Sequence, residues 1–129
     1  MGTTALPLAH PLLPSVALAI TLTLLSGVGD ALGFVHAARI WQGDAIQWPS
    51  VARSGGAFAF GMVMQWVSLR FQHRVGITVA ELQAAVWFAA TMIGIAVLSR
   101  AVHQWAVTDR LVAVGVLCGL TWLVVRTGG

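Results

Sequence analysis

Asp30 is the residue whose type and position are best suited to chemistry. It lies inside an apolar stretch, where an ionisable side chain costs at least about 2.5 kcal/mol unless it faces protein or water. We therefore expect Asp30 to line a helix contact or a cavity and to bind a proton or a cation. In the alternative, it lies near the helix end and snorkels or pairs with Arg39 or Arg100. On a helix, its neighbours three, four and seven positions away are small or weakly polar apart from one phenylalanine: Thr23, Ser26, Gly27, Gly33, Phe34 and Ala37.

A second polar stripe follows at helical spacing. Gln83, Trp87, Thr91 and Gly94 recur every three or four residues and would share one helix face. We expect that face to turn toward the interior of a bundle. Trp87 and Trp66 lie deeper in apolar sequence than the span ends that indole rings favour, so both are candidate binding residues. The candidate set for substrate or proton binding is Asp30, Trp87, Trp66 and Gln83.

The other reactive side chains indicate structural roles. Glu81 follows Thr78 by three positions, which predicts a capping box at a helix start. The histidines fall at or beyond the ends of the apolar stretches, without metal-ligand spacing, and Cys118 has no basic neighbour to activate it. There is no Ser-His-Asp arrangement, phosphate loop or CxxC motif. We therefore expect no catalytic residue, no metal site, no cofactor and no enzymatic activity.

The composition is that of a membrane protein. Of 129 residues, 58% are hydrophobic and 9% are charged, against about 25% charged residues in soluble domains. So few charges cannot cover the surface of a soluble domain of this size. The seven basic residues are all arginine and are spread singly along the chain, whereas nucleic-acid binding needs a clustered basic patch. We expect the lipid bilayer, and no nucleic acid, as the immediate partner.

Four stretches are long and apolar enough to cross a bilayer as helices, which takes about 20 residues each. They lie at about residues 13–35, 51–69, 79–99 and 111–125, within a single transmembrane domain covering residues 1–129. The predicted fold class is all-α, an integral membrane four-helix transmembrane bundle. Its short loops make sequential helices antiparallel neighbours. Two GxxxG patterns predict close helix packing, at Gly29 and Gly33 and at Gly115 and Gly119.

The arginines do not set an orientation across the membrane. Four predicted spans place three arginines on one side and four on the other, so the positive-inside rule gives almost no bias. Either a partner holds the protein in one orientation, or copies insert both ways and pair antiparallel.

Three passages of the chain resemble a known family. Asp30 precedes Trp48-Pro49-Ser50, Trp87 closes the segment Ala84-Ala85-Val86-Trp87, and residues 94–115 join the last two predicted spans. In this order they are similar to the membrane carboxylate, the Trp-Pro, the Tyr-to-Trp motif and the third-to-fourth helix passage of the small multidrug resistance proteins, within the drug/metabolite transporter superfamily. The resemblance spans roughly residues 25–127, with Asp in place of the family's Glu and no aromatic residue at Ala84.

Two classes of function follow. The resemblance implies a transporter that couples a proton at Asp30 to the export of a small cationic or amphipathic solute. The alternative is a non-catalytic accessory subunit of a larger membrane complex, respiratory or photosynthetic. Accordingly, the expected partners are further copies in a homo-oligomer or the subunits of such a complex. We expect a multi-pass protein of a bacterial inner (plasma) membrane.

Overall fold

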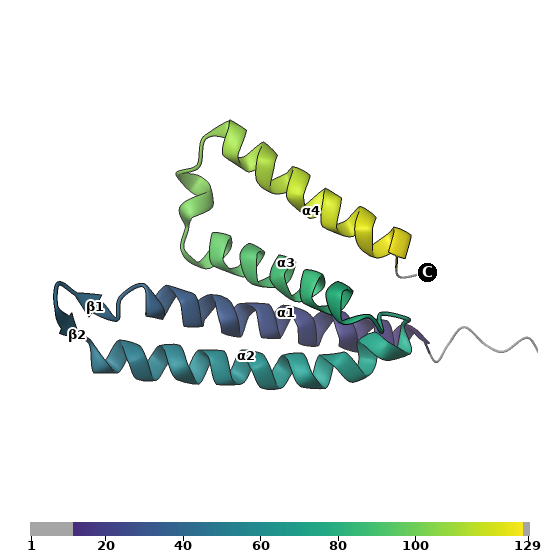
Figure 1. Cartoon of the computed structure of the whole chain (residues 1–129), viewed down its shortest axis with the longest axis horizontal. Helices are drawn as coiled ribbons and strands as arrows, with labels where there is room; N and C mark the ends of the chain where they lie inside the picture. Colours follow the sequence, from purple (N-terminus) through teal and green to yellow (C-terminus); the bar gives the residue numbers. More distant parts are fainter. Residues whose placement is uncertain (1–11, 128–129) are drawn as a thin grey trace, which may run out of the picture.

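The computed structural model describes residues 12–127, which form an all-α structure apart from one small hairpin (Figure 1). Each predicted stretch is helical, which confirms the four-helix part of the prediction. The second helix extends beyond its predicted stretch at both ends. The helices are α1 (Leu12–Ala37), α2 (Trp48–Arg74), α3 (Ala80–Leu98) and α4 (Val107–Thr127), with a 3-10 turn, η1 (Ala101–His103), before the last.

Three of these helices, α1, α3 and α4, are long and apolar enough to cross a membrane. This supports a multi-pass membrane protein. The remaining helix, α2, has 27 residues and is longer than α3, which has 19. It is less apolar because it carries Arg53, Arg70 and Arg74 together with several amide and hydroxyl side chains.

The interior of the described region consists of small and polar residues. Its buried hydrophobic residues are three alanines and Leu82, whereas large apolar side chains such as Leu24 and Trp66 are exposed. Lipid tails solvate apolar surface as well as a neighbouring helix does, so helix contacts in membranes are built from small and hydrogen-bonding residues. This polarity favours a lipid environment independently of the composition. The buried polar residues are Ser15, Thr23, Ser26, Asp30, Ser54, Gln65, Ser68, Gln72 and Thr91.

A tight hairpin turns the chain between α1 and α2. Strand β1 (Trp41–Gln42) pairs antiparallel with β2 (Ala45–Ile46), and Trp41 lies opposite Ile46. Gly43 occupies the turn with φ +62°, a left-handed conformation that favours glycine. The turn was expected only as a short loop. It sends α2 back antiparallel along α1, at the left of Figure 1.

The connection from α2 to α3 is fixed by backbone hydrogen bonds. Gly76 has φ +90°, and its N–H donates to the carbonyl of His73 at 3.2 Å. The N–H of Ile77 donates to the carbonyl of Gln72 at 2.9 Å. These two bonds and the left-handed glycine form a Schellman motif that ends α2.

The predicted capping box at the start of α3 is wrong. The residue before α3 is Val79, in extended conformation and with no side-chain capping hydrogen bond. The helix therefore begins one residue later than a box from Thr78 to Glu81 requires. Glu81 still lies in the first turn, where a carboxylate is favoured by the helix dipole.

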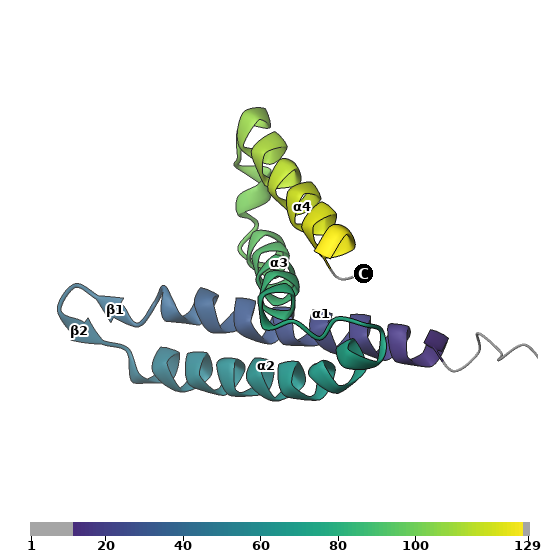
Figure 2. The ribbon, with the colours of Figure 1, turned by 45° about the vertical axis from the view of Figure 1, so that its right-hand side comes forward.

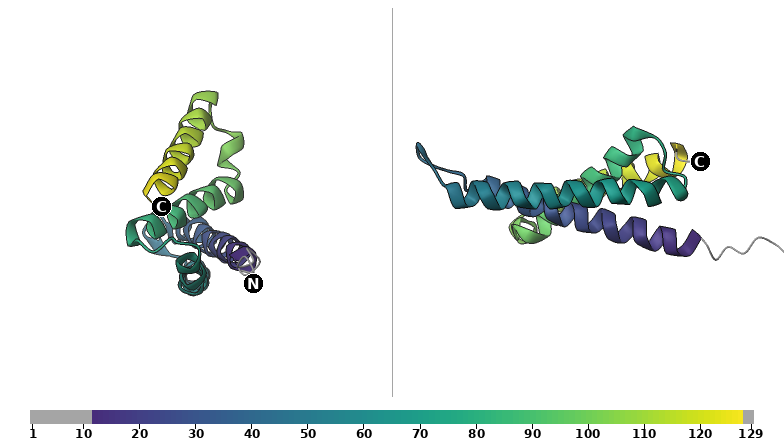
Figure 3. Two further views of the ribbon diagram at one scale, coloured as in Figure 1. Left: turned by 90° about the vertical axis from the view of Figure 1, so that its right-hand side faces the viewer. Right: turned by 90° about the horizontal axis from the view of Figure 1, so that it is seen from below.

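The helices do not all pack as sequential neighbours. The predicted antiparallel pairing is confirmed for α1 with α2, but α3 packs on α1 and touches α2 only slightly. At the α1–α3 contact, Gly27 lies against Ala90 and Gly94 against Ala31. After η1 the chain reverses into α4, which has no buried residue in the described range. Figures 2 and 3 show α4 standing apart from α1 and α2.

Candidate functional site

Asp30 lies where α1, α2 and α3 meet. Its residue is 1% exposed, which makes it one of the most completely buried side chains of the described region. Trp87, from α3, donates a hydrogen bond from its indole Nε1 to Asp30 Oδ2 at 2.5 Å. The alternative, a pairing with Arg39 or Arg100, is not what the structure contains: within residues 12–127, no arginine contacts this carboxylate. The carboxylate thus faces protein, with a neutral donor as its partner.

Gly61, from α2, forms the opposite wall of the site. A Cβ at this position would overlap Asp30 Oδ1 and would stand 2.8 Å from Asp30 Cγ. Only glycine lets the backbone of α2 approach the carboxylate this closely. Gly29 makes the reciprocal approach, because its own Cβ would stand 2.8 Å from Gly61 Cα. The site therefore depends on glycines from both helices.

Further buried polar side chains lie about one helical turn from the three residues that form the site. Ser26, Gln65 and Thr91 are buried; the Ser26 hydroxyl lies beside the Asp30 carboxylate, and the Thr91 hydroxyl oxygen and the Gln65 amide oxygen have no hydrogen-bond partner among the described residues. Ser26 is one turn before Asp30, Gln65 one turn after Gly61, and Thr91 one turn after Trp87. A carboxylate with neighbouring hydroxyl and amide oxygens offers the ligand type that a proton, a water molecule or a hard cation requires.

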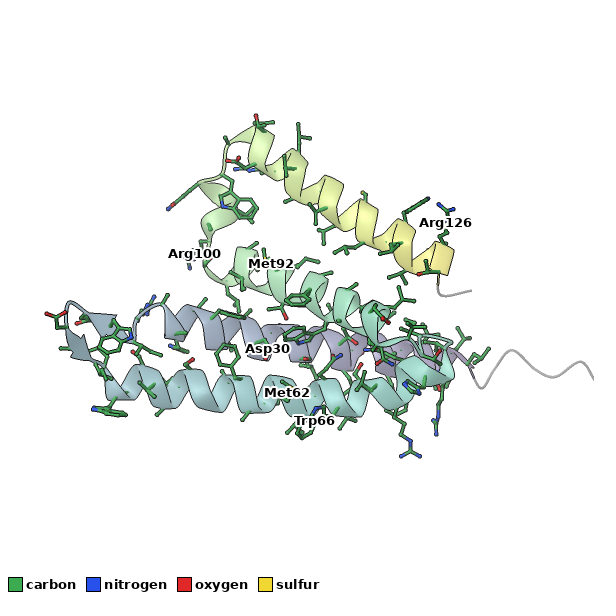
Figure 4. All side chains as sticks on the ribbon, viewed as in Figure 1. Asp30, Met62, Trp66, Met92, Arg100 and Arg126 are labelled. Carbon is green, nitrogen blue, oxygen red and sulfur yellow. The ribbon has the colours of Figure 1, made fainter. Side chains whose placement is uncertain are left out.

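The structure brings together only part of the predicted site. Asp30 and Trp87 meet, and the stripe from Trp87 to Thr91 and Gly94 faces the interior as predicted. Trp66 does not join them: it is 64% exposed and points away from α1 on the far side of α2 (Figure 4). Gln83 donates from Nε2 to the carbonyl of Ile77 at 3.1 Å and so ties the first turn of α3 to the preceding connection.

A second polar cluster was missed by sequence reasoning. Thr23, Ser68 and Gln72 are mutually hydrogen-bonded and buried about two turns from Asp30 along α1. A usable signal was present, because Gly61, Gln65, Ser68 and Gln72 recur at helical spacing on α2. It was overlooked because the predicted span ended at residue 69, which placed Gln72 outside the membrane segment.

The two GxxxG patterns have different surroundings. A Cβ at Gly29 would meet Gly61 at 2.8 Å, and one at Gly33 would meet the Phe58 ring at 2.7 Å. Both glycines therefore lie in the α1–α2 contact. Gly115 and Gly119, on α4, have no atom of the described residues within 4 Å of an added Cβ. The expected helix packing at these two positions has no partner within this part of the chain.

Comparison of the chain with protein-family models, with curated proteins and with solved structures finds no match. The likeness to small multidrug resistance proteins therefore rests on the sequence passages themselves, and the function has to be argued from the site.

Proposed function

We propose that the chain is a four-helix transmembrane bundle in a bacterial inner membrane, with α2 as the fourth span. The charges of α2 lie toward its two ends, at Arg53, Arg70 and Arg74, and the segment between Arg53 and Arg70 carries none. Its polar side chains face α1 and its large apolar ones face outward. A helix of modest hydropathy can cross a bilayer when a neighbouring helix satisfies its polar face.

We further propose that the protein is a transporter of the drug/metabolite type, which couples a proton to the export of a small cationic or amphipathic solute. The observation that carries this proposal is the buried Asp30 carboxylate, which is held by Trp87 and has no arginine partner among residues 12–127. An ionisable group inside a membrane bundle marks an ion or substrate path by default. Asp30 would bind the proton or the solute cation in turn, and the Trp87 ring would face the bound solute.

The packing supports a division into a rigid and a moving part. The α1–α2 pair is held by close glycine contacts and by several hydrogen bonds. By contrast, α3 packs on α1 and makes one side-chain hydrogen bond to it in the described region, from Trp87 to Asp30. Breaking this bond when Asp30 changes its charge or its ligand would release α3, which is the movement that alternating access needs.

The test uses the purified protein in proteoliposomes with an imposed pH gradient and tetraphenylphosphonium, a lipophilic cation, as the probe. We expect wild type and Glu81→Gln to transport the probe in exchange for protons that move down their gradient. Probe transport by Asp30→Asn should fall to the level of empty liposomes. Glu81 is a matched control because it is an exposed carboxylate. Trp87→Phe should weaken probe binding while the protein remains folded. Unchanged proton-driven transport by Asp30→Asn would refute the mechanism.

The exposure of α4 favours a second candidate, an accessory subunit of a larger membrane complex. α4 has no buried residue, and a shallow hollow of about 470 Å³ lies on it, lined by Val114, Cys118 and Trp122 among others. Such a face suits either a second copy of this chain or a different subunit. Purification in a mild detergent separates the two: an isolated homo-oligomer that binds the probe supports the transporter, and stoichiometric co-purification with a large complex supports the subunit.

A further inference from the structure

The carboxylate of Asp30 divides the contact between α1 and α2 into two halves. The exposed residues Arg53 and Arg70 mark the ends of the uncharged part of α2, which measures about 25 Å at 1.5 Å per residue. Gly61, which lies against the carboxylate, is near the midpoint between these arginines. With α2 as a membrane span, Asp30 is therefore near the middle of the bilayer, and a proton has to cross about half of the hydrocarbon core to reach it.

The half toward the end of α2 contains the hydrogen-bonded cluster of Thr23, Ser68 and Gln72. The Thr23 and Ser68 hydroxyl oxygens are 2.7 Å apart, and Gln72 Nε2 lies 3.1 and 3.0 Å from them. Gln72 belongs to the last turn of α2, which ends at Arg74, and the nearby Arg70 is exposed. Long charged side chains near a span end reach the membrane surface. The cluster thus begins at that surface, at the opposite end of the bundle from β1 and β2 (Figure 1).

Buried polar side chains continue from this cluster to Asp30. Ser26 is fully buried and lies between Thr23 and Asp30 on the same face of α1. Its hydroxyl is beside the Asp30 carboxylate. On α2, Gln65 is buried one turn before Ser68, on the side toward Asp30. Polar side chains therefore recur at every helical turn from the membrane surface to Asp30.

The half toward the hairpin contains no such series. Here the Phe58 ring lies against Gly33, and the Phe34 and Phe58 rings pack edge to face with their centroids 5.0 Å apart. The hydroxyl of Ser54, beyond these rings, donates to the carbonyl of Gly33 at 2.9 Å. The stretches of the three helices that lead from the level of Asp30 toward the hairpin have no hydroxyl, amide or charged side chain: residues 31–35, 55–60 and 92–98.

Of the groups that meet the carboxylate, only Ser26 can pass a proton. Trp87 of α3 donates its one N–H to Asp30 Oδ2, and an indole has no acceptor to take a proton. Gly61 of α2 has no side chain, and no second titratable group within residues 12–127 contacts Asp30. The Ser26 hydroxyl can both donate and accept, so it can donate to the carboxylate and receive the proton of the acid.

We propose that this buried carboxylate exchanges its proton with one membrane surface only, that of the α2–α3 connection. The path runs through the hydroxyls of Ser68, Thr23 and Ser26. Each hydroxyl accepts a proton on its oxygen and passes its own hydrogen to the next group, so one proton moves and every hydroxyl is restored. One buried water completes the step from Thr23 to Ser26, which are one turn apart with about 5–6 Å between their Cβ atoms. The Gln65 amide can bond to this water in either orientation, because its NH2 group donates and its oxygen accepts.

The path rests on the proposed proton binding at Asp30 and on α2 as a membrane span. The test follows the Asp30 carboxyl group by time-resolved infrared absorption after a rapid pH jump. It uses the full-length protein in nanodiscs, which expose both membrane surfaces to the buffer, and Asp30→Asn identifies the band. We expect Thr23→Val, which removes the hydroxyl and keeps a similar shape, to slow proton exchange about tenfold, the effect of raising a barrier by about one hydrogen bond.

Two further variants separate the path from packing. Thr23→Ser keeps the hydroxyl and should keep the wild-type rate. Ser54→Ala is the matched control, because it removes a buried hydroxyl from the same helix contact on the other side of Asp30, and it should leave the rate unchanged. A wild-type rate in Thr23→Val, or equal slowing by Ser54→Ala, would overturn the path.

The remaining outcomes also decide. If Thr23→Val does not fold, Ser26→Ala takes its place, and an unchanged rate in that variant would refute the path. Probe transport that depends on Asp30, together with an unchanged exchange rate in the hydroxyl variants, would leave the transporter standing and remove the path alone. A wild type in which the Asp30 band does not respond to pH would remove the proton binding and the path together.

Discussion

The segments Gly29–Gly33 in α1 and Gly115–Gly119 in α4 share one sequence pattern and have opposite surroundings. The first is filled by Gly61 and Phe58 of α2, and the second has nothing of the described chain against it. The pattern itself only makes close approach possible. The difference arises because α2 returns along α1 with its own glycine at the matching level, whereas no helix of the described chain returns along α4. A small-residue stripe therefore has to be read together with its partner.

Among variants of the two glycine segments, Gly29→Ala should have the largest effect on the free energy of unfolding. Its Cβ would stand 2.8 Å from the Cα of Gly61, and backbone cannot move aside as a side-chain tip can. We expect a loss of about 1–3 kcal/mol in the free energy of unfolding, as in other overpacked sites. Unfolding in mixed micelles by titration with a denaturing detergent measures it. Gly56→Ala is the control: Gly56 lies in α2 with open space around it, so alanine should stabilise by about 0.5–1 kcal/mol. Equal effects of the two variants would contradict the packing.

A smaller effect is expected from the hydrogen bonds that accompany the packed glycines. Ser68→Ala removes the hydroxyl that joins Thr23 and Gln72, and we expect a loss of about 0.6 kcal/mol, the average for helix–helix hydrogen bonds in membranes. Thr121→Ala is the control on α4, because its hydroxyl bonds only to the carbonyl of Leu117 in its own helix. The same detergent titration applies. A larger loss for Thr121→Ala would mean that α4, and not α1–α2, carries the stabilising polar contacts.

The smallest effect on the single chain is expected at Gly115. Gly115→Ile should leave the unfolding free energy nearly unchanged, because no described atom contacts this position, while energy transfer between labelled copies in liposomes should fall if α4 pairs copies. Val116→Ile, at an exposed neighbouring position, is the control. Cys118 is exposed and offers a second readout, since oxidation would cross-link copies that meet there. Unchanged energy transfer and no cross-link would indicate that this face of α4 contacts lipid or another protein.

The sequence alone was sufficient to predict where the helices lie and which residues share the helix face of Asp30. Apolar length located all four helices, and helical spacing correctly placed Thr23, Ser26, Gly27 and Gly33 on the buried face with Asp30. Phe34 and Ala37, predicted on the same face, are not buried, and Phe34 is 48% exposed. These features are local, since they depend on the period of one helix.

The rest depends on relations between helices, which spacing within one helix cannot contain. Trp66 and Trp87 both lie well inside predicted spans, but only Trp87 lies on the helix face that meets Asp30. Trp66 is left outside because the face of α2 that is buried carries Gly61, Gln65 and Ser68 instead. Likewise, the capping box was wrong because α3 begins at Ala80, after an extended Val79 that makes no side-chain cap.

The Gly43 hairpin has a consequence for how the protein enters its membrane. An isolated α1 would expose Asp30 and its neighbouring hydroxyls to hydrocarbon, at a cost of about 2.5–3.5 kcal/mol for the aspartate alone, and an isolated α2 would expose Gln65 and Gln72. With α2 as the fourth span, as proposed above, a turn of this tightness would deliver both helices together, and each would cover the other's polar face during insertion. Integration of α1 should therefore become efficient only when synthesis has passed the end of α2, which glycosylation-site mapping of truncated chains can measure.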